Sequence, residues 1–187
     1  MKLTVVSSKV PEHVMLDLET LGQRAGCAVL SIGAVLFTPR RVTKEFYAVV
    51  TLRSARRAGL VVDPATERWW SEQSAQARTV LTMAKDRKLS VPLRGALQAF
   101  AAWLPPNAKV WGNGADFDQP ILSAAYDACG LPVPWKFYHS RCYRTVKNLA
   151  PTVALKRVGT YHNALDDAKS QAVHLQRVLR QLKLPLA

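Results

Sequence analysis

The chain has 187 residues, of which 49% are hydrophobic and 21% are charged, a composition typical of folded globular proteins and unlike that of disordered chains. Its formal net charge of +13 and its pI near 10.1 predict attraction to a polyanion such as nucleic acid, with improved solubility as the alternative explanation. No segment approaches the roughly 18 consecutive apolar residues of a membrane-spanning helix, so we expect no membrane insertion.

Three strands are predicted in the first part of the chain, at 13–20, 27–37 and 44–52. The short link TPRRVT between the last two predicts a hairpin and therefore an antiparallel pair. In the first strand, HVMLDLET, the side chains of Asp17 and Glu19 point to one face of the sheet, because side chains alternate along a strand. Two carboxylates held so close repel each other, and cations are the obvious groups to neutralise them.

Helical patterns dominate the rest of the chain. The predicted helices lie at 63–81, 90–104, 119–130, 141–149 and 164–182, and strands are predicted between them at 109–114 and 134–140. This order of elements predicts an α/β fold in which helices pack on the faces of a mixed sheet. No long polar linker divides the chain, so we expect a single domain over residues 1–187.

Two further segments carry acids that are positioned to join the first pair. Asp118 follows the strand at 109–114, where ligands collect in open sheets, although capping of the next helix is an alternative role for this residue. Asp166 and Asp167 lie in the first turn of the last helix, where acids also favour the helix dipole. Projection of that helix places Asp167 at the edge of its apolar stripe and Asp166 in solvent, with His162 just before the helix.

These acids form an all-oxygen set, which suits hard cations such as Mg²⁺ or Mn²⁺. The chain has neither paired cysteines nor a His-x-x-x-His motif, which argues against a zinc site. The members of the set are Asp17, Glu19, Asp118 and Asp167.

The segments LDLETLG, WGNGADFD and HNALDDA resemble, in order and character, the three exonuclease motifs of the DnaQ-like DEDD superfamily. His162 stands five residues before Asp167, which is typical of the DEDDh branch. The chain is most similar to compact phage and bacterial exonucleases, including a mycobacterial type of exoribonuclease, from about residue 14 to about residue 175. One position departs from the pattern, because relatives often carry an acid in the segment SRCYRTV, where this chain has Cys142.

The resemblance implies a ribonuclease H-like fold with a mixed five-stranded sheet flanked by helices. It also implies a metal-dependent enzyme that hydrolyses the phosphodiester bonds of single-stranded nucleic acid, RNA or DNA, from the 3′ end and releases nucleoside monophosphates. Its motif acids match Asp17, Glu19, Asp118 and Asp167, which would be catalytic as ligands of two divalent cations, with Asp17 bridging the pair. His162 matches the family's general base.

A second group of residues is expected to contact the substrate. Thr20, Leu21 and Gly22 directly follow the first acids, and the family uses this segment at the terminal nucleotide. Trp69 and Trp70 point to neighbouring helix faces, so one is expected to pack inward while the other stacks on a base, with two ordinary packing tryptophans as the alternative. Basic clusters in LRSARRAG, KDRK and LKR are expected to guide the phosphate backbone. The substrate-binding predictions are Thr20, Leu21, Gly22, Trp70 and Asn113.

Several alternatives stay open at this point. A non-catalytic nucleic-acid-binding domain on the same fold would explain the charge, as would an assembly protein that docks an acidic partner. An internally cutting nuclease would also cluster carboxylates, but the spacing of His162 and Asp167 argues against it. A homodimer is also left open. Lys2 is followed by no sustained apolar segment, and the cysteines Cys27, Cys129 and Cys142 are scattered, so we expect no secretory signal and a cytoplasmic location.

Overall fold

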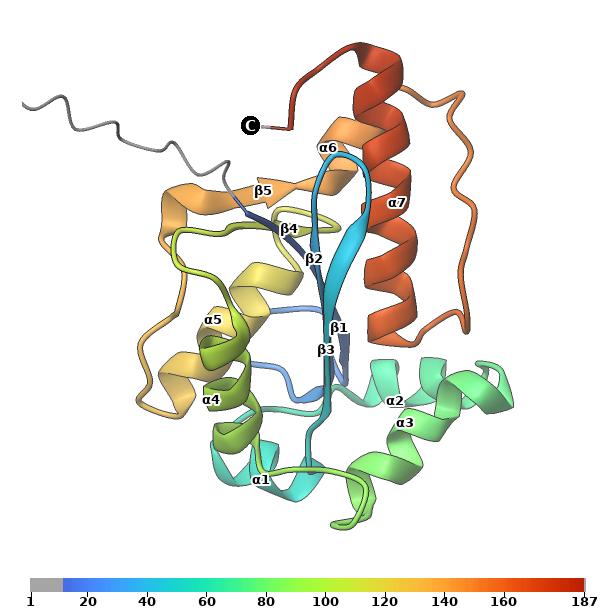
Figure 1. Ribbon diagram of the computed structural model, residues 1–187. Coiled ribbons are helices and arrows are strands. Elements are labelled where there is room, and N and C mark those ends of the chain that lie inside the picture. Colours follow the sequence, from blue (N-terminus) through green and yellow to red (C-terminus); the bar gives the residue numbers. More distant parts are fainter. Residues whose placement is uncertain (1–11, 187) are drawn as a thin grey trace, which may run out of the picture.

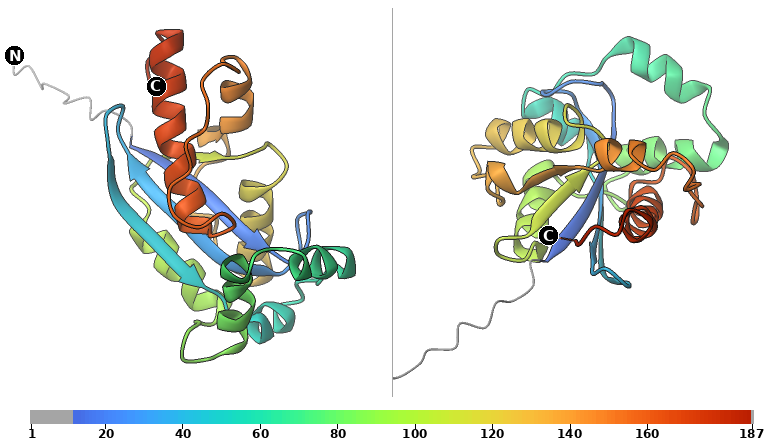
Figure 2. Two further views of the ribbon diagram at one scale, coloured as in Figure 1. Left: turned by 90° about the vertical axis from the view of Figure 1, so that its right-hand side faces the viewer. Right: turned by 90° about the horizontal axis from the view of Figure 1, so that it is seen from above.

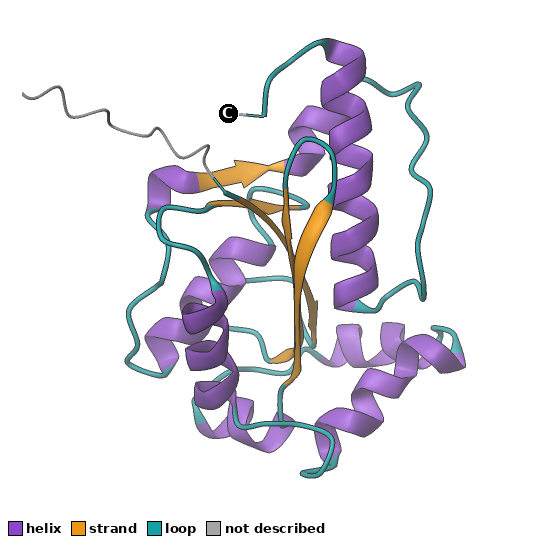
Figure 3. Ribbon diagram, in the orientation of Figure 1, coloured by secondary structure: helices purple, strands orange, loops and turns teal. Residues whose placement is uncertain are grey.

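The computed structural model describes residues 12–186, so the prediction about a secretory signal lies outside it. Its centre is a five-stranded sheet in the order β3-β2-β1-β4-β5. The strands are orange in Figure 3 and lie among the purple helices. The first three strands pair antiparallel, whereas β4 pairs parallel to β1 and β5 pairs parallel to β4, so the sheet is mixed as predicted. The strands are β1 (His13–Thr20), β2 (Val29–Phe37), β3 (Val42–Val49), β4 (Lys109–Gly112) and β5 (Ser140–Cys142).

Helices cover both faces of this sheet (Figures 1 and 2). One face packs against α6 (Tyr143–Asn148) and the long α7 (Ala164–Leu182), whose residues form a core cluster with those of β1, β2 and β4. The other face forms the larger core cluster, to which the remaining helices contribute. These are α1 (Leu52–Arg57), α2 (Pro64–Ser71), α3 (Ala75–Lys85), α4 (Leu93–Trp103) and α5 (Asp118–Ala128), and a 3-10 turn covers Phe137–His139. No helix within residues 12–186 is long and apolar enough to cross a membrane.

Alternation along β1 decides which face carries the acids. Leu16 and Leu18 belong to the larger core, whereas Met15 packs in the core beneath α7. Asp17 and Glu19 follow Met15 at two-residue steps and therefore point to the α7 face. The predicted orientation of the two carboxylates is thus the one that the strand adopts.

Gly33 lets the first turn of α7 approach the sheet. It pairs with Asp17 across β1 and β2, and a Cβ atom at this position would lie 2.1 Å from the carbonyl carbon of Ala164. Any side chain here would push α7 away from the sheet, because backbone atoms cannot move aside cheaply. The absence of a side chain at Gly33 therefore brings Asp167, one turn into α7, close to the acids of β1.

The helix predicted at 63–81 is wrong as a single element, because the chain breaks between α2 and α3. Asp63 does cap the first helix, with its Oδ1 accepting a hydrogen bond from the backbone of Ala65 at 2.9 Å. Ser74 then starts a new helix by accepting from the backbone of Ala77 at 3.1 Å. Serine favours such a cap over a helix interior, which is the physical reason for the break.

Two predicted strand boundaries are also wrong. The third strand ends at Val49 instead of residue 52, and Leu52 already belongs to α1, which the sequence reading missed. The edge strand expected at 134–140 is a 3-10 turn at Phe137–His139, and pairing with β4 begins only at Ser140. Phe137 and Tyr138 are 86% and 55% exposed, whereas Trp135 packs into the larger core, so a strand-like composition occurs here without a strand partner.

Cys142 provides a weak start for α6. Its Sγ accepts the backbone N–H of Thr145 at 3.4 Å, whereas Asn163 at the start of α7 accepts from two backbone amides. Sulfur is a weak acceptor, and a carboxylate at an N-cap also favours the helix dipole.

We therefore expect Cys142→Asp to stabilise the protein by about 1 kcal/mol, the typical contribution of a good N-cap. For a chain of this size that corresponds to a melting temperature higher by about 2–4 °C. Thermal unfolding followed by circular dichroism measures the difference, with Cys142→Ala as the control that removes the cap. A melting temperature for the Asp variant no higher than that of the Ala variant would contradict this role.

Candidate active site

A cleft of about 510 Å³ opens where β1 and β4 end, between the N-terminus of α5, the helix α2 and the first turns of α7. All five residues predicted to carry the chemistry line it. They come from four places that are far apart in the sequence: β1, the start of α5, the segment before α7, and α7 itself. The residues are Asp17, Glu19, Asp118, His162 and Asp167.

The two carboxylates of β1 differ in their partners. Asp17 accepts a hydrogen bond from the side-chain amide of Gln171 on α7, with 2.7 Å between Oδ1 and Nε2. Glu19 is 6% exposed, and within residues 12–186 no hydrogen-bond donor contacts its carboxylate. A buried carboxylate without a hydrogen-bond donor is costly in free energy when it is ionised. Of the four acids, Glu19 is therefore the one that a bound cation would stabilise most.

Asp118 is held by the backbone on both sides. Its Oδ1 accepts the N–H of Leu18 from β1 at 3.2 Å, and its Oδ2 accepts the N–H of Asn113 at 2.7 Å. Gly112 allows this approach, because a Cβ there would lie 2.9 Å from Oδ2 of Asp118. These contacts tie the start of α5 to the end of β1 and place the carboxylate in the cleft instead of using it to cap its own helix.

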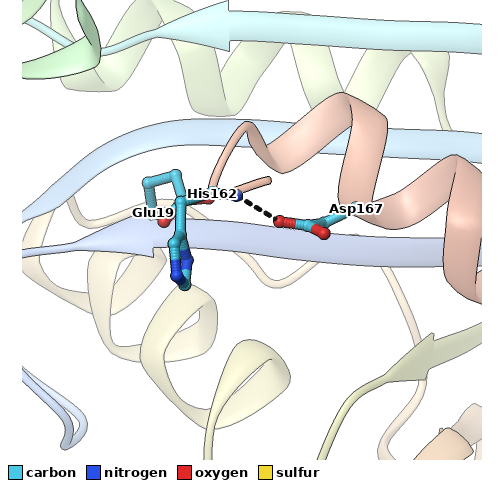
Figure 4. A group of neighbouring side chains, drawn as sticks. All are labelled: Glu19, His162 and Asp167. Carbon is cyan, nitrogen blue, oxygen red and sulfur yellow. Dashed lines mark hydrogen bonds between the residues drawn. The ribbon is translucent and has the colours of Figure 1, made fainter. Parts of the chain in front are cut away.

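Asp167 and His162 are joined through the backbone, as Figure 4 shows. The N–H of His162 donates to Oδ2 of Asp167 at 2.8 Å, and His162 has a φ of 60°, a left-handed conformation that few residues with side chains adopt. Ligand atoms of Glu19, His162 and Asp167 all lie within 4.8 Å of one another. Strain of this kind persists only where neighbouring contacts enforce it, which here are those of α7.

Burial shifts the pKa values of all four acids upward. Burial, followed by the charges of Asp167 and Asp118, raises the pKa of Glu19 to about 8. Burial raises the pKa of Asp118 to about 7 against the opposing effect of its hydrogen bonds. Burial and the neighbouring carboxylates raise the pKa of Asp17 well above its usual range, and burial raises that of Asp167. Without a counterion, the cleft therefore disfavours its own ionised state.

This donor set fits divalent cations. The four acids supply only oxygen, and Glu19 offers a buried carboxylate with no competing donor within residues 12–186. Hard cations such as Mg²⁺ and Mn²⁺ prefer such ligands. Asp17, Glu19, Asp118 and Asp167 are the residues that could hold them, and ions placed there would favour the ionised carboxylates that burial disfavours.

The imidazole of His162 is surrounded by aromatic rings. Tyr161 stacks on it with ring centroids 3.7 Å apart, and Trp69 meets it edge-on at 4.9 Å. Burial, with a smaller contribution from the charge of Arg157, lowers the pKa of His162 below its ordinary value of 6.5. The ring is therefore neutral at physiological pH, which is the state that can accept a proton.

The predicted substrate-binding residues are placed unequally. Thr20, Gly22 and Asn113 line the cleft, but Leu21 is 1% exposed and belongs to the larger core. The pairing register shifts between Glu19 and Thr20, and this irregularity turns Leu21 away from the face that carries the acids. A direct contact of Leu21 with substrate does not fit this position.

Of the two tryptophans, Trp70 is buried and Trp69 is exposed. Trp70 is 1% exposed, and its indole N–H donates to the backbone oxygen of Thr20 at 2.9 Å, so it fastens α2 to the end of β1. Trp69 is 40% exposed and lines the cleft beside His162. Trp69 therefore replaces Trp70 as the ring available for stacking on a base.

Sequence reasoning missed several residues that shape the site. Gln171 lies four residues after Asp167 on α7, and this helical spacing is a signal that could have identified it. Asp166, predicted to be solvated, is half-buried and accepts the N–H of Thr160, so it fastens the segment before His162. Arg157 and Tyr161 lie in the connection before α7, where no periodic pattern points to them.

Comparison with known proteins assigns the family. The model of the 3′-5′ exoribonuclease Rv2179c-like domain matches residues 12–179, which is most of the chain. The chain belongs to this exoribonuclease family. Among curated proteins no match is found.

Solved structures share the fold of this exoribonuclease family member at low sequence identity. The nuclease domain of 3′hExo, a DEDDh family member bound to rAMP, matches with a TM-score of 0.64 and 13% identity over 93% of this chain and 94% of that one. A 3′-exonuclease that recognises the histone mRNA stem-loop matches with a TM-score of 0.60 and 12% identity over 94% and 84%. Cell-death related nuclease 4 matches with a TM-score of 0.60 and 13% identity over 91% and 64%.

Membership of the exoribonuclease family confirms the predicted class of activity, a metal-dependent 3′-5′ exonuclease that acts on nucleic acid. The likeness to the solved structures confirms the predicted ribonuclease H-like fold. The alternative of a non-catalytic binding domain is not favoured, because the cleft retains all four acids and the histidine.

Proposed function

We propose that the chain shortens single-stranded RNA from its 3′ end, releasing nucleoside monophosphates, with two Mg²⁺ or Mn²⁺ ions held by Asp17, Glu19, Asp118 and Asp167. The observation that carries this proposal is the meeting of four carboxylates and a neutral imidazole in one cleft. The description of the family favours RNA over DNA. A strand with a free 3′ end is the expected partner, because the matched family is described as 3′-5′ exoribonucleases.

Hydrogen bonds hold two of the acids in position. The two oxygens of Asp118 are oriented by backbone amides, and Asp17 is oriented by Gln171. When bound, the two cations would polarise the scissile phosphate, lower the pKa of a water molecule and stabilise the charge on the leaving 3′ oxygen. The contact of Asp17 with both ions is implied by the family resemblance, and the charges of the other three acids all raise the pKa of Asp17.

His162 would act as the general base. In hydrolysis, water adds to the phosphorus of the last nucleotide, the bond to the 3′ oxygen of the preceding nucleotide breaks, and that oxygen takes up a proton from solvent. One imidazole nitrogen of His162 would take the proton that the attacking water loses. Its lowered pKa keeps the ring ready for this task at neutral pH, and the rings of Tyr161 and Trp69 limit its rotation.

The terminal nucleotide would lie among the residues that line the cleft around the acids. Trp69 offers an exposed ring for stacking, a contact that contributes about 1–3 kcal/mol per base. Thr20, Gly22 and Asn113 lie near the first-motif and second-motif acids, where the sugar and phosphate of the last residue would be placed. The net charge of +13 would attract the rest of the strand.

A polarity assay tests the proposal. RNA labelled at its 5′ end should give a ladder that shortens one nucleotide at a time with Mg²⁺ or Mn²⁺, and a chelator should stop the reaction. A matched strand with a 3′-terminal phosphate should be shortened more slowly. The same assay on matched DNA measures the preference for RNA over DNA, and on duplex RNA it measures the preference for single strands over duplex. Internal fragments at early times would overturn the proposal in favour of an internally cutting nuclease.

Two further parts of the proposal are independent of the cleft. Cys27, Cys129 and Cys142 are all free thiols, which supports the cytoplasm as the compartment. A homodimer is retained as a proposal that sedimentation or light scattering would test directly.

A further inference from the structure

Arg157 places a positive charge on the acid cluster. It lies in the connection between α6 and α7, and its Nη1 is 2.7 Å from Oδ1 of Asp167. Its guanidinium group also lies 3.7 Å from the centre of the Tyr161 ring, a cation–π contact. Among the ion pairs within residues 12–186, this is the one that involves an acid of the cleft.

The contact occupies an atom that a metal ion would need. Oδ2 of Asp167 already accepts the backbone N–H of His162, and Oδ1 accepts Arg157, so both carboxylate oxygens are engaged. A divalent cation at Asp167 would compete for these oxygens and would repel a guanidinium group only one hydrogen bond away. The side chain of Arg157 is 43% exposed, so it can swing away from Asp167 without disturbing the core.

A substrate phosphate would give Arg157 a second hydrogen-bond acceptor in the same cleft. It lines the cleft beside the acids, so a substrate phosphate placed at the acids lies within its neighbourhood. Guanidinium groups bind phosphate through paired hydrogen bonds, which are stronger than a single contact to a carboxylate. A nucleic-acid strand that enters the cleft therefore offers Arg157 a better hydrogen-bond partner than Asp167, and the carboxylate of Asp167 is then free to bind the metal.

We propose that Arg157 is an internal counter-cation that competes with the divalent metal for Asp167 and transfers to the substrate phosphate, so that metal and nucleotide bind cooperatively. The proposal rests on the proposed metal site. Bound metal displaces the guanidinium group from Asp167 and frees it for the phosphate. Bound phosphate draws the guanidinium group away from Asp167 and frees that carboxylate for the metal. The two binding free energies are therefore coupled, and such coupling is reciprocal. Tyr161 stacks on both Arg157 and His162, so the transfer of the guanidinium group also affects the support of the proposed base.

Metal affinity tests the proposal without any measurement of activity. We expect Arg157→Ala to bind Mn²⁺ about two- to five-fold more tightly than the wild type in calorimetric titrations without nucleotide, the scale of a partly exposed ion pair. Lys156→Ala removes an equal charge from the neighbouring position, and Lys156 makes no ion pair within residues 12–186, so its Mn²⁺ affinity should stay near the wild-type value. Arg157→Lys should fall between the two.

Cooperativity with nucleotide gives the second readout. Adenosine monophosphate should tighten Mn²⁺ binding in the wild type by a larger factor than in Arg157→Ala. In thermal unfolding, Arg157→Ala should lose stability in chelator but not in saturating Mn²⁺, because the ion pair exists only in the metal-free protein. This comparison within one variant separates the role of Arg157 from a general folding defect.

Three results would overturn the inference. They are an unchanged or weaker Mn²⁺ affinity in Arg157→Ala, an equal gain in Lys156→Ala, and an unchanged cooperativity factor. Their meaning differs from a failure of the proposed function, because a wild-type protein that binds no Mn²⁺ would overturn the metal site itself. Normal metal binding with no effect of Arg157 would overturn only the competition.

Discussion

Asp17→Asn is expected to make the metal-free protein more stable at about pH 8 and to lower exonuclease turnover by about 10³-fold or more. Asparagine keeps the oxygen that accepts the amide of Gln171, so the local geometry survives. It removes a buried charge that Asp118, Glu19 and Asp167 repel, which favours the folded state without metal. It also removes a metal ligand, and bound metal contributes several kcal/mol to transition-state stabilisation, which corresponds to about 10³-fold in rate.

The gain in stability should depend on pH in a defined direction. The folded pKa values of Glu19 and Asp118, about 8 and about 7, lie above their ordinary values of 4.5 and 3.8. The folded state therefore binds more protons than the unfolded state between these limits, and the metal-free protein loses stability as pH rises through this window. Asp17→Asn removes part of that loss, so its advantage over the wild type should be small near pH 4 and largest near pH 8.

Calorimetric unfolding in chelator across this pH range measures the effect. Asp127→Asn provides a matched control, because Asp127 is an exposed acid on the same helix as Asp118 and lies outside the cleft. This control should retain turnover and show no comparable pH-dependent gain. If Asp17→Asn unfolded at a lower temperature than the wild type at about pH 8, the acids would be structural elements of the fold and not a site that awaits cations.

The parts of the site that follow from local periodicity could be predicted from the sequence. Alternation along β1 places Asp17 and Glu19 on one face, and the pattern of α7 gives its bounds and the inward position of Asp167. Both follow from regular repeats of backbone geometry, which a single sequence displays directly. The meeting of these acids in one cleft also follows from the family motifs, which supply the long-range information that periodicity lacks.

The errors occur where regular geometry is interrupted. The nearness of Leu21 to the acids predicts a contact with substrate, but a register shift after Glu19 turns its side chain into the core. The break at Ser74 and the exposed turn around Phe137 likewise depend on caps and partners that composition alone does not reveal. Arg157 reaches Asp167 from an irregular connection, whose path is fixed only by tertiary hydrogen bonds such as the one that Asp166 accepts.

The segment before α7 shows how the fold positions His162. Ser170 donates to the backbone oxygen of Asp166 and accepts the N–H of Val158, and Asp166 accepts the N–H of Thr160. Tyr143 and His174 share a hydrogen bond of 2.6 Å, and His174 contacts the backbone oxygen of Val153. The connection is therefore fastened to α7 at several points, and the left-handed backbone of His162 is a consequence of this attachment.

His162→Asn is expected to lower turnover by about 10²–10⁴-fold, the usual contribution of a general base, while Mn²⁺ affinity stays close to that of the wild type. Asparagine is the suitable replacement, because it tolerates the left-handed φ of 60° better than alanine and keeps the backbone N–H that donates to Asp167. A loss of rate therefore reports on the imidazole and not on a displaced carboxylate.

The pH dependence separates this role from simple packing. At saturating Mn²⁺, wild-type kcat/KM should fall on the acid side as His162 becomes protonated, below its ordinary pKa of 6.5, because burial lowers that pKa. The Asn variant has no proton to gain at this position, so the acid limb due to the imidazole should disappear along with most of the rate. A variant that kept both wild-type turnover and the acid limb would assign the proton transfer to another group, and the stack of Tyr161 on His162 would then be purely structural.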